Sequence, residues 1–157
     1  MGLVVAGIRI INLHKKYKLK ENLLKKIIVD VLKKIKRSGD AELEFVFLDD
    51  RSIRRLNKKY KKADRATDVL SFRLDKDGTC GKKFLGNIFI SVDRAFANSR
   101  IFNTCPENEL VLYVIHGILH LFGYDDGTEA KKSRMRDKER KIISGLCRNL
   151  SGVLTLR

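Results

Sequence analysis

Tryptophan is absent from this chain of 157 residues, proline occurs once, and cysteine occurs three times. The cysteines are Cys80, Cys105 and Cys147, and no two of them form a Cys-x-x-Cys pair. An odd number of scattered cysteines supports neither a disulfide framework nor a cysteine-rich zinc site, and it is typical of a reducing compartment. We therefore expect a cytoplasmic protein.

Long apolar runs are also missing. The most apolar segment near the start, residues 3–11, is interrupted by Arg9 and lacks the charged-then-apolar layout of a secretory signal. No segment approaches the roughly 18 apolar residues that a membrane-spanning helix needs. The sequence therefore predicts no membrane span.

Acidic residues are few beside basic ones: 34 lysines and arginines face 19 acids, for a formal net charge of +15. Such an excess favours a polyanionic partner, either nucleic acid or an anionic membrane surface. Residues 51–65 concentrate the positive charge and hold one acid, Asp64. Helical spacing places four cations of this segment on one stripe, and bulky apolar residues that would favour a membrane are few beside them. We predict that the stripe binds nucleic-acid phosphates, with a merely solvated helix face as the alternative; it consists of Arg51, Arg55, Lys58 and Lys62.

The apolar residues predict interleaved strands and helices in one domain that spans residues 1–157. Period-two and β-branched runs predict strands at 3–13, 42–48, 68–74 and 84–91. Apolar stripes of period 3.6 predict helices at 21–37, from about 50, at 93–99, from about 104 to Gly123, and at 129–147. The expected fold class is α+β, with a mixed sheet of about four strands packed against about five helices.

Several local details follow from this assignment. Asp50 or Ser52 is expected to cap the second helix, which should turn Tyr60 inward together with Ile53 and Leu56. Thr104 is expected to cap the most apolar helix, with Glu107 completing a capping box. His14 lies among lysines and is expected at the surface.

Two of the three histidines, His116 and His120, lie four residues apart on the most apolar helix. Residues at this spacing stand one above the other on a single helix face, so two imidazoles can reach one metal ion. Gly123 can end the helix in a left-handed conformation and let the chain turn back, so that Asp125 or Asp126 approaches the imidazoles. Three protein ligands with an open position are typical of catalytic zinc. The alternative is that both histidines are satisfied core or surface side chains.

A metalloprotease of the zincin type is a third reading of this spacing. In those enzymes the residue after the first histidine is a glutamate that serves as general base. Here that residue is Gly117, so the base of peptide hydrolysis is missing.

The string HGILHLFGYDD at residues 116–126 resembles the His-Gly-x-Leu-His-Leu-x-Gly-Tyr-Asp-His signature of the YbeY family. Two more segments are similar to motifs of that family in the same order: LNKKYKKADRATDVLSF at 56–72 and LGNIFIS at 85–91. The resemblance implies a metal-dependent, single-strand-specific endoribonuclease with a zincin-like His-x-x-x-His helix. It also implies a role in ribosome quality control and in maturation of the 3′ end of 16S-type ribosomal RNA. The implied partners are RNA, the small ribosomal subunit and ribosome-associated proteins.

Carried over residue by residue, the resemblance implies that His116, His120 and Asp126 hold one zinc ion, with other divalent metals as alternatives. The family has histidine at the position of Asp126, but a carboxylate is also an accepted zinc ligand. It has arginine at the position of Lys61, which keeps the positive charge and is expected to offset charge on the scissile phosphate without a bidentate fork. It has aspartate at the position of Asn87.

These departures motivate a second hypothesis: a non-catalytic RNA-binding factor of ribosome assembly with a degenerate metal site. Two residues near the histidines carry open assignments. Tyr124 either donates its phenol into the site or packs against the helix, and Glu139 either orients a ligand histidine or pairs with a nearby lysine.

Overall fold

A four-stranded mixed sheet forms the centre of the computed structural model, which describes residues 7–35, 42–74, 84–146 and 150–157. The strand order is β1-β3-β5-β4, with β1, β3 and β5 parallel and β4 antiparallel to β5 at one edge. A separate antiparallel pair joins β2 to β6 near the end of the chain. The bounds are β1 Gly7–Asn12, β2 Tyr17–Leu19, β3 Glu42–Leu48, β4 Val69–Arg73, β5 Phe84–Ser91 and β6 Leu154–Leu156.

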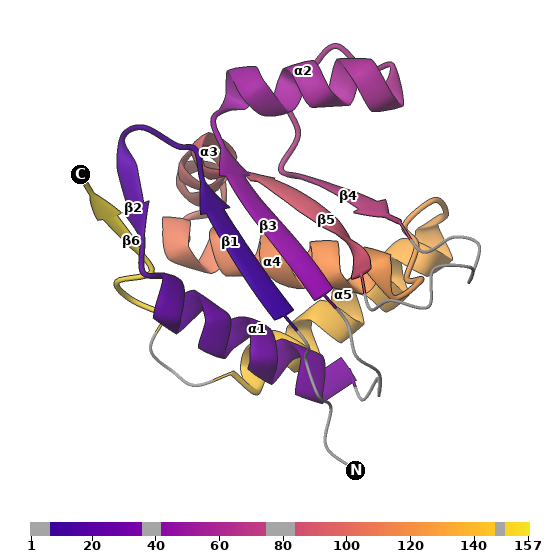
Figure 1. The fold of residues 1–157 in the computed structure, drawn as a ribbon. Coiled ribbons are helices and arrows are strands. Elements are labelled where there is room, and N and C mark those ends of the chain that lie inside the picture. The colour runs from indigo at the N-terminus through magenta and orange to yellow at the C-terminus, as the bar shows by residue number, and fades with distance from the viewer. Residues whose placement is uncertain (1–6, 36–41, 75–83, 147–149) are drawn as a thin grey trace.

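Figure 1 shows helices distributed unequally about the sheet, with most of them on one face and α2 at one end of the other. On one face, α4 lies along the sheet beside α1, and α5 packs against α4. The other face carries α2, and α3 follows β5 directly. The bounds are α1 Glu21–Ile35, α2 Asp50–Lys61, α3 Val92–Phe102, α4 Pro106–Leu121 and α5 Glu129–Ser144.

The sheet has a large core on the α4 face and a smaller one under α2. Phe45 and Phe47 of β3 point into the large core, where α1 and α4 bury apolar stripes. Val46 lies on the opposite side of β3 and joins Ile53 of α2 in the smaller core. Because both faces of β3 are covered, Val46 is buried, although the alternating pattern of residues 42–48 predicted an exposed position there.

The expected α+β class, the mixed sheet of four strands and the helices are confirmed. The bounds predicted for residues 42–48 and 84–91 match β3 and β5, while the other bounds differ by a few residues. The strand pair β2–β6 was not predicted; both strands are only three residues long. Parts of the expected elements at 3–13, 21–37 and 129–147 lie outside the described residues. No helix in the described part of the chain combines the length and apolar character needed to cross a bilayer.

Two predicted caps are wrong. Asp49, not Asp50 or Ser52, caps α2, and its side chain accepts from the backbone N–H of Ser52 at 2.7 Å. Cys105, not Thr104, precedes α4 and makes no capping hydrogen bond with its side chain. Thr104 instead donates its hydroxyl to Glu109 at 2.5 Å.

Two predicted side-chain placements are also wrong. Tyr60 is 53% exposed rather than buried with Ile53 and Leu56, because it reaches only the rim of the core under α2, where its ring meets Phe72. His14 is 4% exposed rather than at the surface. Its Nε2 lies 3.0 Å from Oδ1 of Asp93, a partner 79 residues away in the sequence.

Candidate metal centre

A cavity of about 580 Å³ opens between α4 and the edge strand β4. Its lining brings together side chains from α2, β4, α4, α5 and the turn after α4. Six of the ionisable groups in it are the two helical histidines, two of the acids and two cations. They are Lys61, Arg73, His116, His120, Asp126 and Glu139.

The histidine helix lies unusually close to the sheet at Gly117. A Cβ added to Gly117 would sit 2.5 Å from Cγ2 of Ile88 and 3.2 Å from Oγ of Ser71. Ser71 uses that closeness to donate its hydroxyl to the Gly117 carbonyl at 3.1 Å. A glutamate therefore does not fit at this position, which agrees with the argument against a zincin protease.

The chain reverses direction after α4 at Gly123. This glycine has φ +89°, a conformation that disfavours residues with a Cβ. The N–H of Tyr124 then bonds to the Leu119 carbonyl at 3.0 Å, which closes the turn. The turn carries Asp126 back over the histidine face, as the spacing predicted. Tyr124 is partly buried and packs on the large core.

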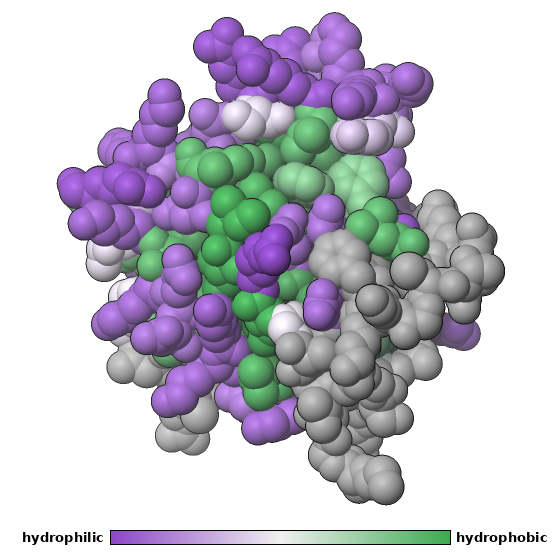
Figure 2. All heavy atoms as spheres, viewed as in Figure 1, coloured by the Kyte–Doolittle hydropathy of each residue, from purple (hydrophilic) through white to green (hydrophobic). Residues whose placement is uncertain are grey.

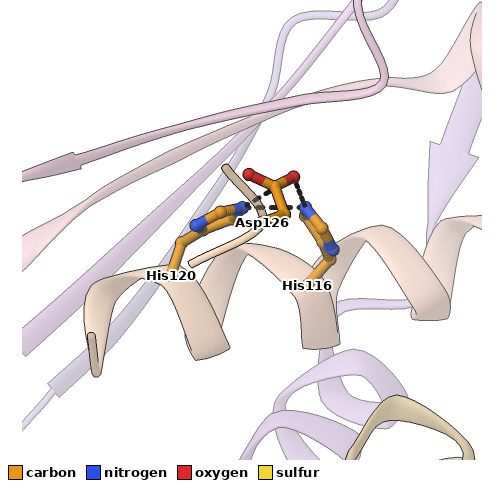
Figure 3. A group of neighbouring side chains, drawn as sticks. All are labelled: His116, His120 and Asp126. Carbon is orange, nitrogen blue, oxygen red and sulfur yellow. Dashed lines mark hydrogen bonds and ion pairs between the residues drawn. The ribbon is translucent and has the colours of Figure 1, made fainter. Parts of the chain in front are cut away.

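Three ligand atoms converge where the turn meets the helix (Figure 3). The Nε2 atoms of His116 and His120 are 2.9 Å apart. Oδ2 of Asp126 lies 3.8 Å from Nε2 of His116 and 3.7 Å from Nε2 of His120. Two ligands at about 2.0–2.1 Å on a tetrahedral zinc ion lie roughly 3.4 Å from each other. Two sides of the triangle are slightly longer than this separation and one is shorter, so the three atoms could surround such an ion after small side-chain adjustments.

Asp126 rather than Asp125 faces the histidines. The Asp125 carboxylate points to solvent, where it accepts from Lys131 at 2.6 Å and from the backbone N–H of Gly127 at 2.9 Å. The hydrogen bond from Lys131 and the one from Gly127 lower the pKa of Asp125 below its ordinary value. The alternative that the sequence left open is thus resolved in geometry.

Glu139 of α5 lies behind His116, with Oε1 2.5 Å from Nδ1. A carboxylate at this distance favours the tautomer with the proton on Nδ1, which leaves the lone pair of Nε2 facing the triangle. Glu139 is 8% exposed. Of the two roles that the sequence left open for Glu139, the structure shows the contact with the histidine.

The second imidazole is held neutral by its surroundings. Burial and the neighbouring His116 lower the pKa of His120 from its ordinary value of 6.5, while Asp126 and a hydrogen bond with the Tyr124 backbone act in the opposite direction. Neutral imidazole is the form that binds metal. The donor set and its spacing therefore fit a divalent ion, and the lowered pKa of His120 favours the same role.

The predicted cation Lys61 lines the same cavity from the end of α2. The four residues of the predicted stripe are all exposed on α2 or directly after it. Lys58 of this stripe binds the Asp64 carboxylate at 2.9 Å. The structure thus brings Lys61 to the histidine site and leaves the stripe on the outer face of α2.

Sequence reasoning missed two groups in the cavity. Arg73 of β4 reaches it and donates from Nη1 to the Leu121 carbonyl at 3.3 Å. The strand pattern could have identified it: Ser71 and Arg73 are two residues apart in β4, so both side chains lie on the side of the strand that faces α4. Asp68 also lines the cavity, and burial raises its pKa despite the hydrogen bond from Asn98 at 3.2 Å.

Asn87, where the resembling family has aspartate, does not line the described cavity. It pairs with Glu44 of β3 and Phe72 of β4 in the sheet register. Its side chain is on the opposite face from Ile88, which meets α4 at Gly117. The substitution at this position therefore does not alter the charge of the histidine site.

Comparisons with known proteins agree with this geometry. Residues 9–147 match the family model described as Endoribonuclease YbeY. A protein of that name from Desulfitobacterium hafniense is 40% identical over 114 residues, which cover 68% of this chain and 73% of the relative. One from Clostridium perfringens is 36% identical over 157 residues, covering 86% and 94% of the two chains.

A solved structure gives the same result at the level of the fold. The solution structure of a Thermotoga maritima protein superposes with a TM-score of 0.58 and 32% identity, covering 87% of each chain. The family model spans most of the sequence, and the resemblance to the family is confirmed. This chain belongs to the YbeY family, a family of RNA-cleaving endoribonucleases.

Proposed function

We propose that this protein is a metal-dependent endoribonuclease whose metal is held by His116, His120 and Asp126. The observation that carries the proposal is the triangle of two Nε2 atoms and one carboxylate oxygen, with sides of 2.9, 3.7 and 3.8 Å. Family membership supports RNA as the substrate. The surrounding cations suit a phosphodiester, which carries a negative charge.

Zinc is the proposed metal, since two imidazoles and a carboxylate with an open position form a donor set typical of catalytic zinc. A bound divalent ion would act as a Lewis acid toward water or a phosphoryl oxygen. Iron, nickel and manganese accept the same donors. Elemental analysis of the purified protein distinguishes these metals.

The protein's own groups divide the remaining work. Lys61 places an ammonium in the cavity, where we propose that it offsets charge that develops on the scissile phosphate. Glu139 fixes the ring of His116 through Nδ1 and so orients the ligand lone pair. Arg73 adds a second positive group on the β4 side of the same cavity.

We further propose that the stripe Arg51, Arg55, Lys58 and Lys62 holds the RNA backbone outside the cavity. Contacts of this kind read shape and charge rather than sequence. For single strands, each neutralised phosphate lowers the slope of log affinity against log salt by about 0.7. The same proposal includes specificity for single strands and a role in the cytoplasm. There the protein would mature the 3′ end of 16S-type ribosomal RNA, act in ribosome quality control, and associate with the small ribosomal subunit and its proteins.

Cleavage of single-stranded and structured ribosomal RNA fragments tests the enzyme. Wild-type protein loaded with zinc should cut them, whereas a chelator or the substitution His116→Ala should abolish cutting. Activity that survives both changes in a preparation free of other nucleases would refute the mechanism. The variant Asp125→Asn is the matched control, because this acid lies beside the site but points away from it.

A second candidate, an RNA-binding assembly factor without catalysis, is favoured by one observation. Asp126 introduces a negative charge where the family has a neutral imidazole, and this makes a bound ion less electrophilic. Tight, salt-sensitive RNA binding with no strand scission under any divalent ion would select this candidate.

A further inference from the structure

Tyr60, which is 53% exposed, is supported from beneath by the sheet. Its ring meets Phe72 of β4 edge to face, with centroids 5.1 Å apart and an interplanar angle of 61°. Phe72 in turn meets Phe89 of β5 at 5.8 Å and 75°. The ring is therefore held in place by the sheet while half of it faces solvent.

The sheet face beneath α2 is apolar, and α2 itself is hydrophilic (Figure 2). Tyr60 is near the end of α2 and meets the sheet at Phe72. Within the part of the chain that the structure describes, its hydroxyl has no hydrogen-bond partner. The hydroxyl therefore does not explain why an aromatic residue stands at this exposed position.

Lysines precede and follow Tyr60 in the chain. Nζ of Lys59 lies 5.1 Å from the ring centroid. The next residue, Lys61, lines the cavity of the metal centre. The nearby acid Asp64 is already engaged by Arg54 at 2.8 Å and Lys58 at 2.9 Å.

The ring and the metal centre lie on the two sides of one edge strand. Phe72, which supports Tyr60, alternates along β4 with Ser71 and Arg73, which line the cavity. Among the described strands, β4 pairs with β5 alone. A single strand that crosses this edge can therefore reach the cavity and the ring.

We propose that Tyr60 is a stacking platform for one base of single-stranded RNA whose neighbouring phosphate lies in the metal centre. The inference rests on the proposed function and adds a positioning residue to it. Stacking on an aromatic ring is open to every base, so the platform selects for single strands rather than for a sequence. In a duplex the bases are already stacked on each other.

Magnitudes favour the base over the present neighbour of the ring. A cation over an exposed aromatic face, such as Lys59 over Tyr60, favours the contact by a factor of about 2 to 5 in its equilibrium constant. A stacked base contributes about 5- to 150-fold. A base therefore displaces Lys59 from the ring, and the released ammonium becomes available to a phosphate.

Equilibrium binding without cleavage tests the proposal. We would titrate a labelled single-stranded RNA dodecamer and its duplex with chelator-treated protein and follow anisotropy. Tyr60→Phe should bind the single strand as wild type does. Tyr60→Leu, which keeps an apolar cover over Phe72, should bind it about 5- to 150-fold more weakly, with an unchanged salt slope because no ionic contact is lost. Duplex affinity should be the same in all variants.

Two controls sharpen the test. Phe102 of α3 is 64% exposed, and Phe102→Leu, which removes this aromatic ring, should leave the affinity for both RNAs unchanged. Tyr60→Trp creates the only tryptophan in the chain, and its emission should be quenched by the single strand but not by inorganic polyphosphate.

Equal affinity of Tyr60→Leu and Tyr60→Phe, unquenched emission from Tyr60→Trp, or wild-type protein that binds no single strand would each overturn the stacking role. Cleavage by the zinc-loaded protein is scored separately. Equal binding of the two variants with intact cleavage removes the platform and keeps the nuclease. Weak binding of Tyr60→Leu without cleavage by any variant keeps the platform and removes the nuclease.

Discussion

Glu139 offers the sharpest test of the metal centre, because it touches a ligand but not the ion. Its carboxylate oxygen lies 2.5 Å from Nδ1 of His116, and the residue is 8% exposed. Loss of such a supporting partner typically weakens metal binding by about 10- to 100-fold, or roughly 1.4–2.7 kcal/mol. Glu139→Gln keeps an acceptor for the Nδ1 proton and should fall near 10-fold. Glu139→Ala leaves the ring unsupported and should approach 100-fold.

Competition with a chromophoric zinc chelator measures these affinities directly. Glu129→Gln is the matched control, because Glu129 is on the same helix but is exposed and pairs with Lys132 at 3.0 Å. Circular dichroism verifies that each variant is folded. If Glu139→Gln and Glu139→Ala both bind zinc within twofold of wild type, the carboxylate does not support the ligand and our account of the site is wrong.

Three further predictions concern the same fold. Gly117→Ala should lower the free energy of unfolding, measured in urea, by about 1–3 kcal/mol, because the added Cβ would lie 2.5 Å from Ile88. The better helix propensity of alanine offsets part of this loss. Ile88→Leu removes the contacting methyl group and should reduce the loss. Asp126→Asn should weaken zinc binding in a competition titration, whereas Asp125→Asn should not. Burial alone would raise the pKa of the Asp50 carboxyl, but hydrogen bonds from Arg94, its ion-pair partner, and from Ser91 lower the pKa below its ordinary value of 3.8. The stability from this ion pair is therefore present above pH 3.8 and lost as pH falls through the lower folded-state pKa, so the difference in unfolding free energy between wild type and Asp50→Asn should shrink on acidification.

Local patterns were sufficient where a residue's role depends on its own element. The histidine spacing placed both imidazoles on one face of α4, and Gly123 marked the turn that returns Asp126. The period-two run at 42–48 gave the bounds of β3. The period of 3.6 residues in a helix and of two residues in a strand determines the direction of each side chain without knowledge of the elements packed against it.

Long-range partners decided the rest. Tyr60 falls on the inward stripe of α2, but whether a stripe residue is covered depends on how far the opposing surface extends, and here Tyr60 reaches only the rim of the smaller core. His14 is buried because Asp93 meets it from another part of the chain. Glu139 carried a readable signal, since Met135, Glu139 and Ile142 share one face of α5, yet its partner is a histidine on a different helix.

The group of His116, His120 and Asp126 could hold a metal ion in either kind of enzyme, but the groups around it distinguish the two reactions. In a zincin protease the residue after the first histidine supplies a base to the cleft. In this chain Gly117 faces the sheet, where Ile88 leaves no room for a side chain. The cavity instead receives cations from two other elements, Lys61 of α2 and Arg73 of β4. These cations give little electrostatic stabilisation to a neutral peptide carbonyl before it is attacked. A phosphodiester is already an anion, so they stabilise it when it binds and stabilise it further as charge develops in the transition state. The close approach of α4 to the sheet thus excludes the protease base and brings the histidines to the edge strand that carries Arg73.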